Sequence, residues 1–245
     1  MGDAPVRLAI YDLDRTITRL PTWTPFLLRG ACTLAPWRLA LLPLVALFAL
    51  ARAVKLIDRD QLKQAMHRVL LGPALTQDKA TLLAGRFARF MLDKHIYPGA
   101  RAQMTADRAE GRRIVIATAA HEFYARALAT GLGVDDLVAT RARRVGGERI
   151  SHRIDGANCY GAEKRAMLQG WLAEQGIARE RAHIRFYSDH PSDQPTFDWA
   201  DEAVAVNARS RMRALATSRG WPVLDWRARA TVAPRAPITR RRATR

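Results

Sequence analysis

The sequence is poor in cysteine and has no basic, apolar leader, and each shortage excludes a class of protein. Only two cysteines occur in 245 residues, Cys32 and Cys159, and neither has a second Cys or a His at metal-ligand spacing. A zinc site and a disulfide framework are therefore not expected, and both thiols should be reduced. The first residues, MGDAPVRLAIYDLD, lack a basic start followed by a long apolar run, so a cleaved signal peptide is not predicted.

Acidic residues are also scarce. There are 23 Asp and Glu against 40 Lys and Arg, which gives a formal net charge of +17 and an isoelectric point near 11.2. Such a surface attracts polyanions, whether nucleic acid, anionic lipid headgroups or phosphorylated substrates. No aromatic-rich, basic strand pattern of an RNA-binding module is visible, so no specific nucleic-acid partner is predicted, and no protein partner can be identified.

Short apolar, β-branched runs alternate with helix-like segments over most of the chain. Val6–Tyr11 is one such run, and it ends in Asp-Leu-Asp, as expected of a buried parallel strand with polar groups at its carboxyl end. From residue 112 onward, strands are predicted at RIVIATA, LVATRARR, ERISHRI, IRFYS, AVAVN and PVLDW, with helices at about 121–130, 161–175 and 210–219. This alternation predicts an α/β fold with a doubly wound, Rossmann-like parallel sheet.

Residues 20–98 interrupt the alternation, because they favour helices and show no strand pattern. We therefore expect a core made of residues 1–19 and 99–226, with residues 20–98 inserted after the first strand as an α-helical cap. The last residues, 227–245, contain seven arginines, two prolines and no acid. This composition predicts a basic, disordered tail.

Leu39–Ala51 is the most apolar part of the cap, with thirteen uncharged residues between Arg38 and Arg52. As a helix it would be roughly 20 Å long, against ~30 Å for the apolar layer of a bilayer. A single crossing would separate the two halves of the core. The segment is therefore expected to lie in the membrane interface, to return near Pro43, or to cross an even number of times; the alternative is a buried helix of the cap. Basic residues that suit anionic headgroups surround it: Arg29, Arg38, Arg52, Lys55 and Arg59.

Two carboxylates stand two residues apart where the first strand ends. Extended geometry would send the side chains of Asp12 and Asp14 to one face, although a turn could reorient them. Like charges this close repel unless a cation or a proton lies between them, and a divalent metal would also neutralise phosphate oxygens. The spacing alone is common, and a capped strand end is the plainer explanation.

Residues further along the chain supply the other groups that phosphoryl transfer needs. Thr118 ends an apolar strand and offers a hydroxyl, with amides that can point the same way at a helix start. Lys164 opens a helix, and Asp189 and Asp193 follow the strand IRFYS. Each has an ordinary structural explanation when taken alone. Together, an acid, a hydroxyl, a cation and further acids predict a phosphate-binding site.

These motifs resemble those of the haloacid-dehalogenase superfamily. DLDRT is similar to its first motif, Thr118 to the second, Lys164 to the third and SDHPSD to the fourth, in the family order and with family-like spacings. The final stretch, AVAVNARSRMRALATSRGWPVLDW, is similar to the end of subfamily IB, which includes phosphoserine phosphatases. The resemblance implies that Thr118 and Lys164 bind the phosphate of the substrate and stabilise charge on it.

The same resemblance implies roles for the acids. Asp12 would be the nucleophile that becomes an aspartyl phosphate, and Asp14 the acid that protonates the leaving oxygen and then activates water. Mg²⁺ would be held by the Asp12 carboxylate, the backbone carbonyl of Asp14 and the Asp189 carboxylate. Asp193 would support the metal.

In this superfamily the cap largely sets the choice of substrate. Residues 20–98 contain no Glu and four Asp, so an anion for the ammonium group of phosphoserine is poorly supplied. An apolar segment fringed with arginines resembles phosphatidylglycerophosphatase C, which implies a lipid phosphate such as phosphatidylglycerophosphate and a place at the cytoplasmic face of the inner membrane. Two alternatives remain: a soluble, phosphoserine phosphatase-like enzyme for a small phosphomonoester, and a basic binding protein whose catalytic site has lapsed.

Overall fold

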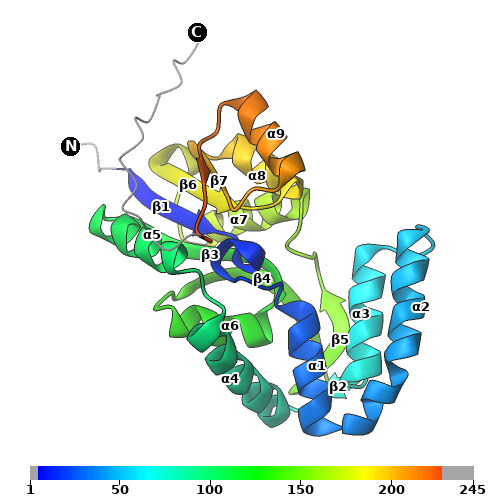
Figure 1. Ribbon diagram of the computed structural model, residues 1–245. Helices are drawn as coiled ribbons and strands as arrows, with labels where there is room; N and C mark the ends of the chain where they lie inside the picture. Colours follow the sequence, from blue (N-terminus) through cyan, green and yellow to red (C-terminus); the bar gives the residue numbers. More distant parts are fainter. Residues whose placement is uncertain (1–4, 228–245) are drawn as a thin grey trace.

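The computed structural model describes residues 5–227, and an eight-stranded sheet forms its centre (Figure 1). The strands, in chain order, are β1 Val6–Tyr11, β2 Ala74–Leu75, β3 Arg113–His121, β4 Asp136–Val145, β5 Arg149–Asp155, β6 Ala182–Ser188, β7 Glu202–Val206 and β8 Val223–Leu224. Their order across the sheet is β2-β5-β4-β3-β1-β6-β7-β8. The parallel strands are β4, β3, β1, β6, β7 and β8, whereas β5 and β2 are antiparallel additions at one edge.

Helices cover both faces of the parallel strands (Figure 1). Their bounds are α1 Trp23–Leu34, α2 Leu42–Ala53, α3 Arg59–Leu70, α4 Gln77–Lys94, α5 Pro98–Ala109, α6 Glu122–Gly131, α7 Ala162–Glu174, α8 Gln194–Trp199 and α9 Ser210–Arg219. Apolar side chains of α4, α5 and α6 pack on one face of the sheet, and those of α7, α8 and α9 pack on the other. The predicted doubly wound α/β fold is therefore confirmed, and the three helices predicted in the second half begin and end within one residue of their expected limits.

The sequence of strand β1 explains why this strand lies in the middle of the sheet. Leu8 and Ile10 belong to the apolar cluster on the α7 side, and Ala9 and Tyr11 belong to the cluster on the α6 side. Successive side chains of a strand point to opposite faces, so a strand covered on both faces must be apolar at every position. All four of these side chains are fully buried.

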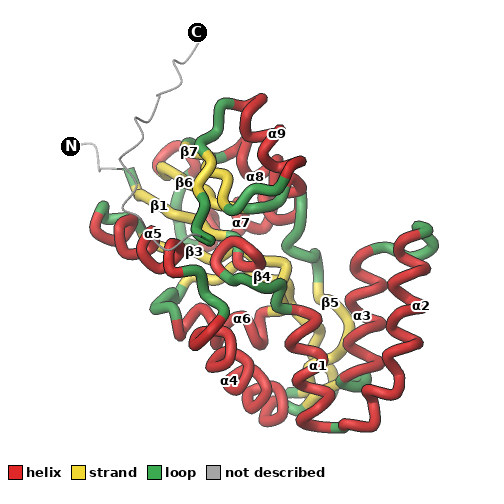
Figure 2. The backbone as a smooth tube through the Cα atoms, viewed as in Figure 1, coloured by secondary structure: helices red, strands yellow, loops and turns green. Residues whose placement is uncertain are grey.

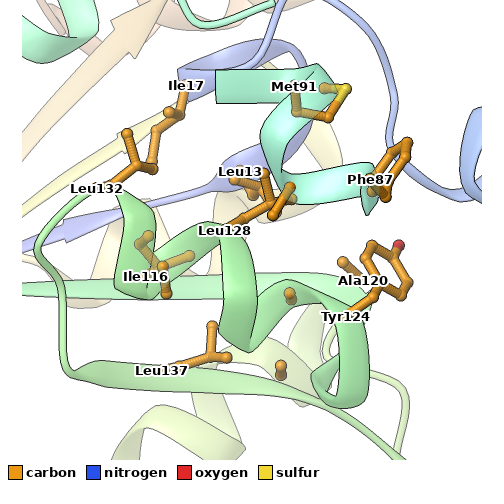
Figure 3. Packing of buried hydrophobic residues seen from close by; sticks show 14 of the residues in the cluster. Leu13, Ile17, Phe87, Met91, Ile116, Ala120, Tyr124, Leu128, Leu132 and Leu137 are labelled. Carbon is orange, nitrogen blue, oxygen red and sulfur yellow. The ribbon is translucent and has the colours of Figure 1, made fainter. Parts of the chain in front are cut away.

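Helix α4 lies against the core although it belongs to the predicted cap (Figure 3). Phe87 and Met91 of α4 pack in the same buried cluster as Leu128 of α6 and as Leu13 and Ile17, which follow β1. Leu13–Ile17 forms a turn that is closed by the backbone N–H of Thr18 on the carbonyl oxygen of Leu13 at 3.0 Å, and the side chains of Leu13 and Ile17 are buried. This packing fixes the turn that carries Asp14.

The rest of residues 20–98 extends away from the core as a helical arm made of α1, a 3₁₀ segment at Pro36–Leu41, α2, α3 and β2, together with β5 (Figure 2). A strand in this part of the chain was not predicted. Strand β2 has only two residues, and its register pairs Ala74 with Ser151 and Leu75 with Ile150 of β5. Two residues carry no detectable periodicity, so only the pairing with β5 defines this strand.

Helix α2 forms the outer edge of the arm beside α3 (Figure 1). None of the residues of Pro36–Leu41 or of α2 is buried, so the expected alternative of a buried cap helix is wrong. Pro36–Ala53 is the one stretch of residues 5–227 that is long and apolar enough for a membrane span, with 18 residues and a mean hydropathy of 1.4. The basic tail predicted at 227–245 lies, apart from Arg227, outside the described residues.

Candidate active site

Three neighbouring strands bring the predicted site residues to one edge of the sheet. The register pairs Tyr11 with Ile116 of β3 and with Tyr187 of β6, and these strands run parallel. Asp12 therefore leaves the sheet beside Thr118 and Asp189. The backbone N–H of Asp12 donates to the carbonyl oxygen of Tyr187 over 2.9 Å, which continues the ladder by one residue.

A buried lysine joins two of the predicted acids. Lys164 Nζ lies 2.8 Å from Asp12 Oδ1 and 2.7 Å from Asp193 Oδ2. Lys164 and Asp193 are 2% exposed and Asp12 is 7% exposed. Burial raises the pKa of Asp12 to about 7, while Lys164 opposes the rise and the charges of Asp193 and Asp189 add to it. The ammonium group thus opposes protonation of Asp12 and is placed to attract a phosphate at the same time.

Asp193 is positioned by two partners on one oxygen. Its Oδ2 accepts from Lys164 and, at 2.6 Å, from Ser188 Oγ. Its other oxygen, Oδ1, is buried and has no hydrogen-bond partner in the described part of the chain. A buried, unpaired carboxylate oxygen is costly, so it marks a place for a cation or a donor from outside the protein.

Asp189 faces Asp12 across a threonine hydroxyl. Thr16 Oγ1 lies 3.2 Å from Asp12 Oδ2 and 3.4 Å from Asp189 Oδ1, and it accepts the backbone N–H of Asp189 at 3.0 Å. Burial, with the charge of Asp193 as the second cause, raises the pKa of Asp189 to about 6. Two carboxylates that approach one point and resist ionisation need a cation between them.

The donor set fits Mg²⁺. Among residues 5–227, no three His, Cys, Asp or Glu side chains form a metal cage on their own. Mg²⁺ does not require one, because it is usually held by one or two carboxylates and completes its shell with water and substrate phosphate. The carboxylates of Asp12 and Asp189, with a backbone carbonyl, match that requirement.

The carboxylate of Asp14 has different hydrogen-bond partners from the carboxylate of Asp12. The backbone at Asp14 has φ −69° and ψ 119°, and Arg15 follows with φ 61°, so the chain leaves the extended geometry in which both acids would share a face. Asp14 Oδ1 accepts the backbone N–H of Thr22 at 2.8 Å. Burial raises the pKa of Asp14, and the hydrogen bond from Thr22 partly opposes the rise. A carboxyl group with a raised pKa keeps its proton to a higher pH than an exposed one does, which suits it to deliver that proton.

Thr118 is buried at the predicted edge, and the predicted helix begins four residues further along the chain. Strand β3 continues to His121, and α6 starts at Glu122. Thr118 Oγ1 instead accepts the backbone N–H of Ala120 at 3.0 Å. An irregular pairing with β4 between Thr118 and His121 carries the strand up to the start of α6, so the amides that immediately follow Thr118 belong to the strand and not to the helix.

The structure adds residues that the sequence patterns did not single out. Thr16 and Ser188 orient the acids, as described above. Asn207, with φ 51°, donates from Nδ2 to the carbonyl oxygen of Arg15 at 2.9 Å and accepts the backbone N–H of Trp226. It holds the turn after β1 in place. Its only signal in the sequence is its position at the end of the strand AVAV, on the same edge as Asp12.

Comparisons with known proteins place the site in a family. The model of the haloacid dehalogenase-like hydrolases matches residues 9–198, which include all the residues described above except Asn207 and Trp226. A histidinol-phosphatase of Neisseria meningitidis is 26% identical over 134 residues, 54% of this chain and 60% of that protein. A phosphoserine phosphatase of Mycobacterium tuberculosis is 31% identical over 134 residues, 54% of this chain but 42% of that protein. The chain thus spans less than two thirds of the length of either relative.

A solved structure of a Bordetella pertussis protein of unknown function has a closely similar fold. It superposes with a TM-score of 0.80 at 24% sequence identity, over 91% of this chain and all of the other. At this level of identity the likeness concerns the fold and leaves the chemistry to be argued from the site.

Proposed function

The chain belongs to the haloacid dehalogenase-like hydrolase family, and from this membership we propose that it is a magnesium-dependent phosphatase that hydrolyses phosphomonoesters through an aspartyl phosphate on Asp12. The observation that carries the proposal is the contact of Lys164 with both Asp12 and Asp193 at 2.8 and 2.7 Å. One cation on the nucleophile and on a second acid lets an anionic substrate approach a carboxylate that would otherwise repel it.

The proposed reaction has two displacements at phosphorus. An oxygen of Asp12 attacks, the bond to the ester oxygen breaks, and the departing oxygen takes its electron pair and the proton of Asp14. Asp14, now ionised, removes a proton from a water molecule that attacks the aspartyl phosphate and releases phosphate and free Asp12. Lys164 and the hydroxyl of Thr118 stabilise the charge on the phosphoryl oxygens.

Mg²⁺ would be held by the carboxylates of Asp12 and Asp189 and by the backbone carbonyl of Asp14, with Asp193 in support. When bound, it neutralises charge on the phosphoryl oxygens and keeps the nucleophile ionised. Asp193 Oδ1, which has no partner within residues 5–227, is available to hydrogen-bond a water of the metal.

The substrate class that the comparisons favour is a small phosphorylated molecule, rather than the lipid phosphate that the sequence pattern favours. The relatives are named as a histidinol-phosphatase and a phosphoserine phosphatase, and both names denote small substrates. We propose that the helical arm and α4 act as the cap that selects among them. Helix α4 contacts the core at α6, and Lys63 of α3 contacts it at Ala119 of β3.

A lipid phosphate remains the second candidate, because α2 exposes apolar side chains that a soluble enzyme has no reason to display. Leu44, Leu47 and Leu50 are 41%, 60% and 59% exposed. Contiguous exposed apolar surface of this kind is typical of membrane or protein contacts. Of the basic residues around it, Arg38 is occupied, because it donates to the carbonyl oxygens of Arg68 and Val69 at the end of α3. On this candidate the enzyme works at the cytoplasmic face of the inner membrane.

Phosphate release with Mg²⁺ tests the proposal, measured on phosphoserine, histidinol phosphate and phosphatidylglycerophosphate in detergent micelles. Asp12→Asn is the blank, and Asp93→Asn, an exposed acid on α4, is the matched control. Turnover of a small phosphate that requires Asp12 supports the first candidate. Turnover of the lipid alone, together with loss of vesicle binding in a Leu44→Ser, Leu47→Ser variant, supports the second. Full activity of Asp12→Asn would exclude the mechanism.

A further inference from the structure

A group of buried donors lies beside Asp14 and is not used in the reaction described above. We name it the donor cluster, and it consists of Trp23 from α1, Lys63 and His67 from α3, and His121 from the end of β3. The ring centroids of Trp23 and His121 are 4.8 Å apart, those of Trp23 and His67 5.9 Å, and those of His67 and His121 6.3 Å. Lys63 Nζ lies 5.6 Å from the centre of the Trp23 ring.

The donor cluster borders the reacting groups on two sides. Trp23 directly follows Thr22, whose N–H binds Asp14. Lys63 Nζ donates to the carbonyl oxygen of Ala119, the residue after Thr118, and its charge acts on Asp14. Since Asp14 protonates the departing oxygen in the proposed function, the alcohol portion of the substrate must leave the phosphate on this side.

Most of the polar atoms in the donor cluster have no partner. Both ring nitrogens of His67, both of His121 and the indole nitrogen of Trp23 are buried without a hydrogen bond. These five atoms belong to a set of seven such side-chain atoms within residues 5–227. Buried polar atoms are almost always paired, so a concentration of unpaired ones in one place is the mark of a missing ligand.

The chemistry of the cluster defines the ligand. Trp23 and charged Lys63 have donors only, whereas each neutral imidazole has one donor and one acceptor nitrogen, so donors outnumber acceptors in the cluster. Burial lowers the pKa of His67 to about 3 and that of Lys63 to about 7, so an anion placed here gains a neutral donor on each imidazole and restores the charge of the lysine. The nearest acid along α3, Asp60, is occupied by Asn158 Nδ2.

A surface cavity lies next to the donor cluster, at Asn158. Asn158 Oδ1 accepts from Lys63 Nζ at 3.3 Å, and the same residue lines a cavity of about 480 Å³ between α3 and the loop before α7. Two bases, Arg52 and Arg59, and two acids, Asp60 and Glu163, line this cavity. Asn158 borders both the cavity and Lys63, so a ligand group that extends from the cluster toward the surface has to pass this residue.

We propose that the donor cluster is the subsite for the alcohol portion of the substrate and selects phosphomonoesters whose alcohol carries a second oxyanion, a carboxylate or another phosphate. The inference rests on the proposed phosphatase activity for the direction of the substrate. It predicts discrimination against alcohols that carry an ammonium group, because the cluster would place like charges or unpaired donors against it.

The test compares substrates that differ only in the second group. In the full chain with Mg²⁺, we expect kcat/KM for phosphoglycerate and for glycerol bisphosphate to exceed that for glycerol phosphate by about tenfold to a hundredfold, and phosphoethanolamine to be the poorest. Lys63→Met should reduce this preference to near unity, Lys63→Arg should restore part of it, and Lys79→Met, an exposed lysine on α4, should leave it unchanged. The two anionic substrates show whether the second group is a carboxylate or a phosphate.

Equal kcat/KM values for phosphoglycerate and glycerol phosphate in the unaltered chain, or an unchanged preference in Lys63→Met, overturn the inference while leaving the phosphatase proposal intact. If Lys63→Met fails to fold, Trp23→Phe removes a single donor and should reduce the preference in the same direction. Absence of turnover with every phosphomonoester defeats the proposed function instead. In that case calorimetric binding of phosphoglycerate and glycerol phosphate decides on the subsite, and equal affinity would overturn it.

Discussion

Thr22 donates its backbone N–H to Asp14 Oδ1 over 2.8 Å, so a residue at the start of the arm holds the carboxylate of the proposed acid, while the core holds the turn from which this side chain projects. Thr22 also pairs through its hydroxyl with Tyr124 Oη of α6 at 2.9 Å. The orientation of Asp14 thus depends on the docking of α1 against α6.

We predict that Asp14→Asn separates the two displacements. With nitrophenyl phosphate the leaving group needs little protonation, so Asp12 should still become phosphorylated, whereas activation of water should be slowed by about 10²- to 10⁴-fold. The variant should release a burst of nitrophenolate equal to the enzyme concentration and then turn over slowly, as rapid-mixing absorbance would show. A steady rate equal to that of the unaltered enzyme would remove Asp14 from this role.

Replacement of Lys164 by Met should damage both stability and activity. The change leaves Asp12 and Asp193 buried without their shared cation, and removal of one partner of a buried ion pair costs about 3–5 kcal/mol. Urea unfolding should show a lower midpoint with little change in slope. Lys94→Met, at the exposed end of α4, is the control. A loss of activity with no loss of stability would mean that the two acids find other partners.

Mg²⁺ should stabilise the protein more as pH rises. Burial raises the pKa of Asp12 to about 7 and of Asp189 to about 6, so the metal-free fold favours their protonated forms. The contribution of these groups to stability is therefore present at low pH and is lost as pH rises through about 6 and 7, whereas Mg²⁺ binds the ionised forms. The shift in unfolding temperature on adding Mg²⁺ should be larger at pH 8 than at pH 5. A shift independent of pH would place the metal elsewhere.

His67→Gln should make the free energy of unfolding depend less on pH in the acid range. Burial lowers the pKa of His67 to about 3 from its ordinary value of 6.5, so the fold favours the neutral ring. The stability that this provides is complete above pH 6.5 and is lost as pH falls toward 3, by up to about 1.4 kcal/mol per pH unit. The variant should therefore lose less unfolding free energy between pH 6.5 and 4.5, measured by urea titration. An unchanged slope would show that His67 is protonated in the folded protein.

The elements that a long apolar pattern defines were predictable, and the details that depend on tertiary contacts were not. The strand Val6–Tyr11 is apolar at each buried position, so its burial and the edge position of Asp12 follow from the sequence. The direction of Asp14 does not, because it depends on Arg15 adopting φ 61° while Asn207 holds its carbonyl oxygen. No local pattern links residues that are 192 positions apart.

The partners of the acids were missed for a related reason. Thr16 and Ser188 lie inside the motifs DLDRT and SDHPSD, but no role was predicted for either hydroxyl, and only the parallel register of β1 and β6 shows that both face the same site. The donor cluster was missed because its members come from three separate elements and each, taken alone, is an ordinary residue of a helix or strand. What sets Trp23, His67 and His121 apart is that their buried ring nitrogens have no hydrogen-bond partner among residues 5–227.

Strand β4 belongs to the core and to the arm at once. Its first half pairs with β3, where Val115 is opposite Asp136, and its second half pairs with β5, where Arg141 is opposite Asp155. The arm is thus clamped to the sheet by a continuous two-stranded ribbon and does not hang on flexible linkers. We expect the arm to move together with this ribbon, so a force on α2 that bends the ribbon should also change the distance between α3 and His121.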